Sequence, residues 1–305
     1  MGHAHGKIIL LGEHAVVYGN PAIAIPFVSA TIDAVLSKGT PMMVDTPLFR
    51  GPLREAPEWL DPFKELISAL NRHFDTSALT LSINSTIPIA AGFGSSAAMA
   101  AAIVREYYRY FGEELSAHTL RRWIHMAETK AHGTPSGIDA HATTHDHPFL
   151  FTPPADFAPL TMPTQGILII SHSNEQGHTK TAVEMVREQL SNDQCKQCIE
   201  TITRATNIAL EALKRGDLQR LGRCLTDAHK ALSQLKLTTS TVEARIDEAM
   251  RAGALGAKMS GGGLGGAVIA LAPTPVIAQR IKDAWETHTN DVFIMDLKEE
   301  FHAQR

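Results

Sequence analysis

The stretch PIAAGFGSSAAMAAAIV, residues 88–104, places two glycines and two serines directly before an alanine-rich segment. Residues 79–87 before it alternate apolar and polar side chains, which predicts a strand that ends at Pro88. The alanine-rich segment predicts a helix over residues 96–111, closed by Gly112. The stretch is therefore a strand–loop–helix junction, and its loop is either a capped turn or a site for an anion.

The composition of the loop is compatible with both interpretations. The first N–H groups of a helix carry a partial positive charge, and glycines such as Gly92 and Gly94 let a phosphate approach them. Ser95 and Ser96 can cap the helix, or a serine hydroxyl can bind the cation that accompanies a nucleotide. The loop is not a Walker A loop, because no Gly-Lys-Ser/Thr follows it. Local chemistry leaves the alternatives open.

Composition narrows the class of protein. The chain has 305 residues, 44% of them hydrophobic, and a net charge of -4, which predicts two folded domains. It contains no run of Lys and Arg, so neither nucleic acid nor a membrane surface is the expected partner. Apolar runs are too short to span a membrane, and the start does not read as a signal peptide. Three cysteines fit a reducing compartment, and we expect a cytoplasmic protein.

The order of patterns predicts an α+β fold. Strands and helices alternate irregularly, and a stretch with four prolines at residues 152–165 predicts a boundary between domains 1–158 and 159–305. Beyond it we expect a strand at 166–171, two or three long helices, a glycine loop at 261–266, and a strand–helix–strand ending at 267–297. One helical pattern runs from about 181 to 215 and carries Cys195 and Cys198, which we interpret as two small residues on one helix face.

A carboxylate falls on an apolar helix face. In the helix predicted from Ser116 to Ala131, Leu120, Ile124 and Glu128 are spaced by four residues and share one face. A buried carboxylate without a compensating partner would lower the stability of the fold by about several kcal/mol, because its charge is removed from water. Glu128 therefore either forms a buried salt bridge or binds a cation such as Mg²⁺.

Three further polar positions are candidates for chemistry. Asp139, in HGTPSGIDA, is either a turn residue bonding its own backbone or a base that accepts a hydroxyl proton. Lys7 begins an apolar strand, where it is a surface lysine or a partner of Asp139. Glu13 and His14 follow in a glycine-bounded turn and suit a small polar substrate or a local salt bridge.

A second glycine loop lies near the C-terminus. The segment KMSGGGLGGAVIAL places five glycines in residues 261–266, more than a helix cap requires, which predicts close approach of the backbone to a ligand or to the other domain. Thr179 and Lys180 begin a predicted helix and form a weaker candidate of the same kind.

Three motifs together resemble the GHMP kinase superfamily: GKIILLGEHAVVYGNPAIA (6–24), PIAAGFGSSAA (88–98) and KMSGGGLGGAVIAL (258–271). Within it, GEHAVVYG and HGTPSGID are similar to the mevalonate kinase branch. The chain departs from the usual pattern at His5, at Phe93 and at Ala90-Ala91, none of which has a proposed chemical role.

The resemblance implies a fold and a set of roles. The N-terminal domain would resemble ribosomal protein S5 domain 2, and the C-terminal domain would be ferredoxin-like. ATP would be held by the loop residues Gly92, Phe93, Gly94, Ser95, Ser96 and Ala97, with Thr179 near the phosphates. Mg²⁺ would be bound by Ser96 and Glu128. Asp139 would be the catalytic base with Lys7 paired to it, and Glu13 and His14 would lie near the mevalonate.

The implied reaction is ATP + (R)-mevalonate → ADP + 5-phosphomevalonate, a step of isoprenoid biosynthesis. Two alternatives stand beside it: a sister kinase acting on phosphomevalonate or another small alcohol, and an inactive member that binds or regulates. The "GEHAVVYG" stretch argues against the first, and the presence of Lys7, Glu128 and Asp139 argues against the second. The oligomeric state stays open, with a homodimer among the alternatives.

Overall fold

The computed structural model describes residues 1–39, 41–88, 91–132, 137–154, 156–162 and 165–302. The chain divides into two compact units, each built from segments that are distant in sequence. Unit 1 comprises Met1–Lys7, Pro26–Pro88 and Gly94–Asp146, and unit 2 comprises Ile8–Ile25, Ile89–Phe93 and His147–Arg305. Strands β1 (Gly2–Leu11) and β2 (Ala22–Lys38) each contribute residues to both units.

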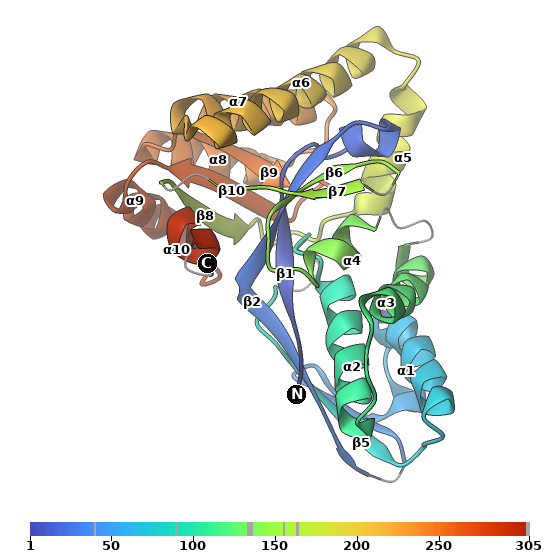
Figure 1. The fold of residues 1–305 in the computed structure, drawn as a ribbon. Helices are drawn as coiled ribbons and strands as arrows, with labels where there is room; N and C mark the ends of the chain where they lie inside the picture. The colour runs from blue at the N-terminus through green and yellow to red at the C-terminus, as the bar shows by residue number, and fades with distance from the viewer. Residues whose placement is uncertain (40, 89–90, 133–136, 155, 163–164, 303–305) are drawn as a thin grey trace. The chain divides into compact units, whose positions relative to one another are not determined.

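Unit 1 combines a sheet with packed helices (Figure 1). Its strands run in the order β4-β3-β5-β2, with β3 parallel to β5 and the other neighbours antiparallel. Helices α1, α2 and α3 pack against one another, and α4 packs against α2 and α3. The bounds are β3 (Met43–Thr46), β4 (Phe49–Pro52), β5 (Leu79–Ser85), α1 (Asp61–His73), α2 (Ser95–Phe111), α3 (Ala117–His132) and α4 (Ile138–Ala142).

Helix α2 lies directly against the sheet of unit 1. A side chain at Gly2 on β1 would collide with the backbone oxygen of Ala102, at 2.1 Å. The buried carboxylate of Glu106 accepts a hydrogen bond from the backbone N–H of Leu36 on β2, at 2.8 Å, and is paired with Arg109. These contacts hold the helix in a defined place on the sheet.

Unit 2 contains a four-stranded antiparallel sheet in the order β11-β8-β10-β9. Numbered along the chain, these strands have the order 4-1-3-2 in a β-α-β-β-α-β succession, which is the ferredoxin-like arrangement. In the same unit β6 pairs with the first residues of β2, and β7 pairs with β6. The strands are β6 (Phe149–Thr152), β7 (Asp156–Pro159), β8 (Ile167–His172), β9 (Gly256–Ser260), β10 (Ala267–Ala272) and β11 (Phe293–Asp296).

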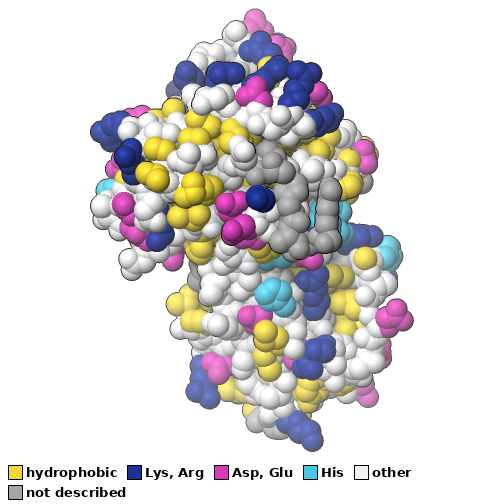
Figure 2. All heavy atoms as spheres, turned by 60° about the vertical axis from the view of Figure 1, so that its left-hand side comes forward, with side chains coloured by type: hydrophobic (Ala, Val, Ile, Leu, Met, Phe, Trp, Pro, Cys, Tyr) yellow, Lys and Arg dark blue, Asp and Glu magenta, His cyan; other side chains and the backbone are white. Residues whose placement is uncertain are grey.

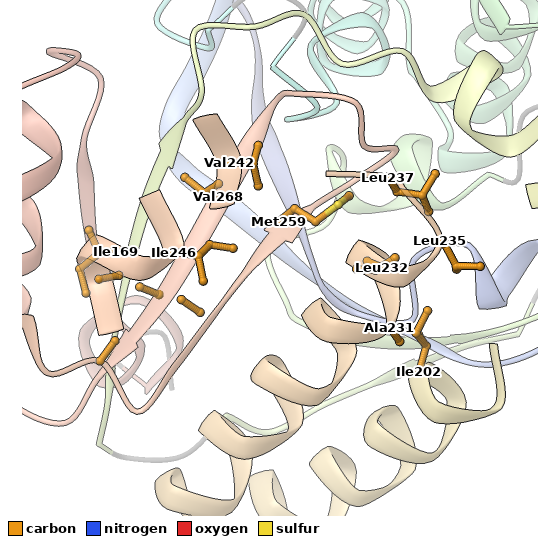
Figure 3. Packing of buried hydrophobic residues seen from close by; sticks show 14 of the residues in the cluster. Ile169, Ile202, Ala231, Leu232, Leu235, Leu237, Val242, Ile246, Met259 and Val268 are labelled. Atoms are coloured by element: carbon orange, nitrogen blue, oxygen red, sulfur yellow. The ribbon is translucent and has the colours of Figure 1, made fainter. Parts of the chain in front are cut away.

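The helices of unit 2 bury the apolar face of this sheet. Figure 3 shows side chains of β8, β9 and β10 converging with those of α6, α7 and α8. Full burial of a large apolar side chain contributes about 1.5–3 kcal/mol. Trp285 on α9 is fully buried, and its indole N–H donates to the backbone oxygen of Arg245. The helices are α5 (Thr179–Gln189), α6 (Asp193–Arg215), α7 (Leu218–Gln234), α8 (Ser240–Ala252), α9 (Pro275–Glu286) and α10 (Leu297–His302).

Most predicted elements are confirmed, with two corrections. The helical pattern over 181–215 is two helices, because Asn192 begins a new one by accepting a hydrogen bond from the backbone N–H of Gln194. Within the described part of unit 2, four helices rather than two or three separate β8 from β9. Cys195 and Cys198 are buried and unbridged on α6, as interpreted. The predicted end of the α3 helix at Gly133 lies outside the described residues.

Two further features concern the distribution of charge on the surface and the apolar character of the helices. On the face of each unit seen in Figure 2, basic and acidic side chains are interspersed. Among the described residues, no helix combines the length and the apolar character needed to cross a membrane.

Candidate active site

Lys7 and Asp139 form an ion pair in unit 1. The Nζ atom of Lys7 lies 3.2 Å from Oδ1 of Asp139. Lys7 is buried on β1, whereas the side chain of Asp139 is 40% exposed in the first turn of α4. Of the two interpretations for each residue, the structure therefore supports the pairing: an accessible carboxylate beside a buried cation.

Helix α2 begins next to this pair. Gly94 is the N-cap of α2 with φ 71°, so neither serine occupies the capping position, and within the described residues no side-chain cap is found there. The capped-turn interpretation, in which Ser95 or Ser96 satisfies the first N–H groups, is therefore wrong. A Cβ on Gly94 would lie 2.8 Å from Cγ of Lys7, so the absence of a side chain lets the lysine cross the start of the helix.

Ser96 and Glu128 lie on adjacent helices. Ser96 is in the first turn of α2, and Glu128 is on α3, which packs against α2. Glu128 is 4% exposed and shares the buried face with Leu120 and Ile124, as its spacing predicts. The Oγ atom of Ser96 is buried and has no hydrogen-bond partner among the residues that the structure describes.

Glu13 and His14 are both buried in unit 2, in the turn after β1. Oε1 of Glu13 accepts from the ammonium group of Lys258, and its second oxygen, Oε2, is buried without a partner among the described residues. His14 has a left-handed backbone conformation, with φ 59°. Its Nε2 lies 2.7 Å from the backbone oxygen of Gly262.

The contact with Gly262 defines the chemistry of the imidazole. A carbonyl oxygen only accepts, so Nε2 of His14 carries the proton and donates. The pKa of His14 is lowered to about 4, chiefly by burial and also by the nearby charge of Lys258, while the Gly262 hydrogen bond acts in the opposite direction. The ring is therefore neutral at physiological pH, and its buried Nδ1 is an acceptor with no partner in the described part of the chain.

The second glycine loop is packed against two other segments of unit 2. A Cβ on Gly262 would collide with Thr179, at 2.2 Å from its Oγ1, and one on Gly266 would lie 3.2 Å from the backbone oxygen of Ala91. Gly92 approaches the backbone oxygen of Ser260 in the same way. The loop therefore brings together the exposed Thr179 at the start of α5 and the residues that precede Gly94 in sequence.

Two buried polar residues of β9, Lys258 and Ser260, were not singled out from the sequence. The Oγ atom of Ser260 donates to the backbone oxygen of Ile9 and accepts from its N–H, at 2.9 and 3.0 Å, which connects β9 with β1. The signal for Lys258 was a lone lysine in an otherwise apolar strand, GAKMS, where a buried cation needs a partner.

The predicted loop residues differ in what they can offer a ligand. The side chains of Phe93 and Ala97 are buried, so these two residues present only backbone groups. Ser95 and Ser96 are partly buried, and Ser95 is the first residue of α2.

Comparison with known proteins decides the family. The model of the GHMP kinases N terminal domain matches residues 62–147, and that of GHMP kinases C terminal matches residues 209–291. The chain is 32% identical over 301 residues to the mevalonate kinase of Thermococcus gammatolerans, with 90% of this chain and 89% of that protein covered. The chain belongs to the GHMP kinase family.

Solved structures agree with this assignment. The GHMP kinase fold described above matches that of L. major mevalonate kinase in complex with R-mevalonate, with a TM-score of 0.82 and 25% identity, covering 97% of this chain and 94% of that one. It also matches mevalonate kinase from methicillin-resistant Staphylococcus aureus, with a TM-score of 0.77 and 26% identity, covering 97% and 98%. The predicted two-domain GHMP kinase fold is confirmed.

Proposed function

We propose that this GHMP kinase transfers the terminal phosphoryl group of ATP to the C5 hydroxyl of (R)-mevalonate. The relatives named above are mevalonate kinases, and this chain matches them over nearly their whole length. One of them, the L. major enzyme, was solved in complex with R-mevalonate. The observation that carries the proposal is the ion pair of Lys7 with the accessible carboxylate of Asp139, next to the uncapped start of α2.

In this proposal Asp139 accepts the proton of the C5 hydroxyl. The hydroxyl oxygen forms a bond to the terminal phosphorus of ATP, the bond from that phosphorus to the bridging oxygen breaks, and ADP leaves with the electron pair. Lys7 orients the carboxylate from its buried position on β1 and adds positive charge near the transferring group.

The phosphates of ATP are assigned to the first turn of α2. Among the described residues no side chain caps that turn, which favours binding of an anion to its N–H groups, and the helix is 17 residues long, which supports a full dipole at its start. Thr179 begins α5 beside Gly262 and is exposed, so its hydroxyl is a second proposed contact to phosphate.

The residues proposed for Mg²⁺ fit a hard cation. The buried Oγ of Ser96 lacks a partner among the described residues, and Glu128 supplies a buried carboxylate from the adjacent helix. Hydroxyl and carboxylate oxygens are the ligands that Mg²⁺ prefers. When bound, Mg²⁺ would neutralise charge on the phosphates.

Glu13 and His14 are proposed to bind the mevalonate. Both leave one buried acceptor atom without a partner in the described structure, Oε2 and Nδ1. A buried acceptor without a donor is costly, by about 1–3 kcal/mol, so a substrate hydroxyl that donates there would be bound favourably.

The proposal is tested by an assay that measures ADP release and identifies the product. Mevalonate, phosphomevalonate, galactose and homoserine are offered in turn with ATP and Mg²⁺. We expect turnover with mevalonate alone and a product carrying one phosphate. Turnover with phosphomevalonate instead, giving a diphosphate, would support the sister kinase, and no ADP from any alcohol would support an inactive binding protein.

We also infer the cellular compartment of the protein and the division of its chain into domains. Three unbridged cysteines support a reducing, cytoplasmic compartment. Domains 1–158 and 159–305 are kept as the proposed division of the chain, to be tested by limited proteolysis and terminal sequencing. The oligomeric state stays open, with a homodimer among the alternatives, and light scattering of the purified protein decides between them.

A further inference from the structure

Lys258 is a fully buried cation that no part of the proposed chemistry uses. It lies on β9, is 0% exposed, and its ammonium group bonds to Oε1 of Glu13 and to the backbone oxygen of Met259. Burial lowers the pKa of Lys258, and Glu13 opposes this by stabilising the charged form. A buried lysine is retained only with such partners, so its position and that of Glu13 are mutually dependent.

The pairing determines which atom of Glu13 remains available. Because Oε1 is occupied by Lys258, the free lone pairs of the carboxylate are on Oε2, which is buried. The rotation of the carboxylate is thereby restricted, and Oε2 is presented as an acceptor of defined direction.

The segment 258–262, which contains Lys258, also determines which ring nitrogen of His14 carries the proton. Gly262, four residues after Lys258 in sequence, accepts from Nε2 of His14 and leaves Nδ1 as the acceptor. The positive charge of Lys258 also opposes protonation of the imidazole. Glu13 and His14 are consecutive residues, so the segment 258–262 holds two adjacent acceptors.

We propose that Lys258 is a positioning residue for alcohol recognition: by pairing with Oε1 of Glu13, next to a His14 ring whose Nε2 is bonded to Gly262, it maintains Oε2 of Glu13 and Nδ1 of His14 as acceptors for hydroxyl hydrogens of the substrate. Lys258 itself contacts no substrate. The inference rests on the proposed function, because it takes Glu13 and His14 as substrate-binding residues.

Other ionisable groups lie around Lys258 and belong in any analysis of pH. Helices α7 and α8 pack against β9. His229 on α7 bonds through Nε2 to Oε2 of Glu243 on α8, at 3.1 Å, and Asp247 on α8 also acts on it. Burial lowers the pKa of His229, with Lys258 contributing in the same direction and Glu243 opposing.

The first test replaces the charge. In Lys258→Met, we expect the KM for mevalonate to rise about tenfold or more while the KM for ATP stays within about twofold, since loss of a bond to a charged acceptor is worth roughly a factor of ten. The acid limb of the kcat/KM profile for mevalonate should move to higher pH, because His14 protonates more easily without the nearby cation. Lys258→Arg should restore part of both properties.

Lys196 provides the matched control. It is an exposed lysine on α6 whose side chain is 54% exposed and pairs with Asp193. Lys196→Met should leave both KM values and the pH profile unchanged. Equal increases in both KM values for Lys258→Met, or an acid limb that does not move, would overturn the positioning role and leave only a structural one.

A measurement on the unmodified protein covers the case in which the Lys258 variants do not fold. Nitrogen NMR of the histidine side chains reports the tautomer and pKa of His14, assigned with a His14→Gln variant. We expect the Nε2–H tautomer and a ring that stays neutral at pH 6. The Nδ1–H tautomer, or an imidazolium at pH 6, would overturn the inference.

Failure of the proposed function is recognised separately. If Glu13→Gln leaves the KM for mevalonate unchanged, the assignment of Glu13 to the substrate is wrong, and the inference falls with it. If the wild-type protein phosphorylates another alcohol, the proposed substrate is wrong, and the same comparison of Lys258→Met with Lys258→Arg on that alcohol decides the positioning role.

Discussion

The ammonium group of Lys7 lies 3.2 Å from the carboxylate of Asp139, and Cγ of the same lysine lies 2.8 Å from the position that a Cβ on Gly94 would occupy. The proposed base, the cation paired with it and the start of the helix proposed to bind phosphate therefore lie together in one unit. The first three predictions concern this arrangement.

Removing the carboxylate should abolish most turnover. Asp139→Ala is expected to lower kcat by about 10²-fold or more, the usual contribution of a positioned base, without unfolding the protein. The side chain is 40% exposed, so little packing is lost. Steady-state kinetics and thermal unfolding measure both. Asp193→Ala, at a carboxylate 98% exposed on α6, is the control, and unchanged turnover in Asp139→Ala would refute the assignment.

Substitution of the proposed Mg²⁺ ligands should change the dependence of turnover on Mg²⁺ concentration. Ser96→Ala and Glu128→Gln each remove an oxygen ligand, so the Mg²⁺ concentration for half-maximal turnover should rise, with partial rescue at high Mg²⁺. Ser95→Ala, at the neighbouring position of the same turn, should keep the wild-type Mg²⁺ dependence. Wild-type dependence in both ligand variants would mean that Glu128 serves only the structure of α3.

A comparison of Gly94→Ala with Gly112→Ala separates the effect of backbone strain on stability from an effect on activity. The two glycines adopt similar left-handed conformations at the two ends of α2, φ 71° and 73°, but only Gly94 is in contact with Lys7, and Gly112 has open space around it. Alanine should cost each about 1–2 kcal/mol of unfolding free energy. Gly94→Ala should in addition reduce kcat/KM by displacing Lys7, whereas Gly112→Ala should not. Equal kinetics in the two variants would contradict a role for the Lys7–Gly94 contact.

The stability of the protein should fall between pH 6.5 and 4. Burial lowers the pKa of His14 from 6.5 to about 4, so the unfolded chain binds a proton in this window that the folded chain does not. The stabilisation is complete above pH 6.5 and is lost as the pH falls to 4, by up to about 3 kcal/mol. His141, whose pKa burial also lowers to about 4, adds to the same slope.

Urea unfolding at several pH values measures this slope. His14→Gln should flatten it, because glutamine does not titrate, and the part due to His141 should remain. His118→Gln, at an exposed position on α3, should keep the full slope. The same slope in His14→Gln as in the wild type would show that His14 is not buried in a neutral state.

Local patterns were sufficient for much of the fold. The alternation in β5, the alanine-rich face of α2 and the glycine that closes it depend on side chains close in sequence, and the structure confirms them. The break between α5 and α6 was missed because the apolar period continues through it, whereas the cap at Asn192 depends on one side-chain hydrogen bond.

The sequence by itself determined the family, because three motifs of characteristic spacing occur in order, and it placed Glu128 on a buried face by helical period alone. Only the tertiary structure decided the pairings. Lys7 pairs with Asp139 and Lys258 pairs with Glu13 because segments that are distant in sequence pack together. The apolar pattern of a strand does not indicate which side chain from another segment lies beside its lysine. Ion pairs of this kind arise from long-range chain geometry, which no local period encodes.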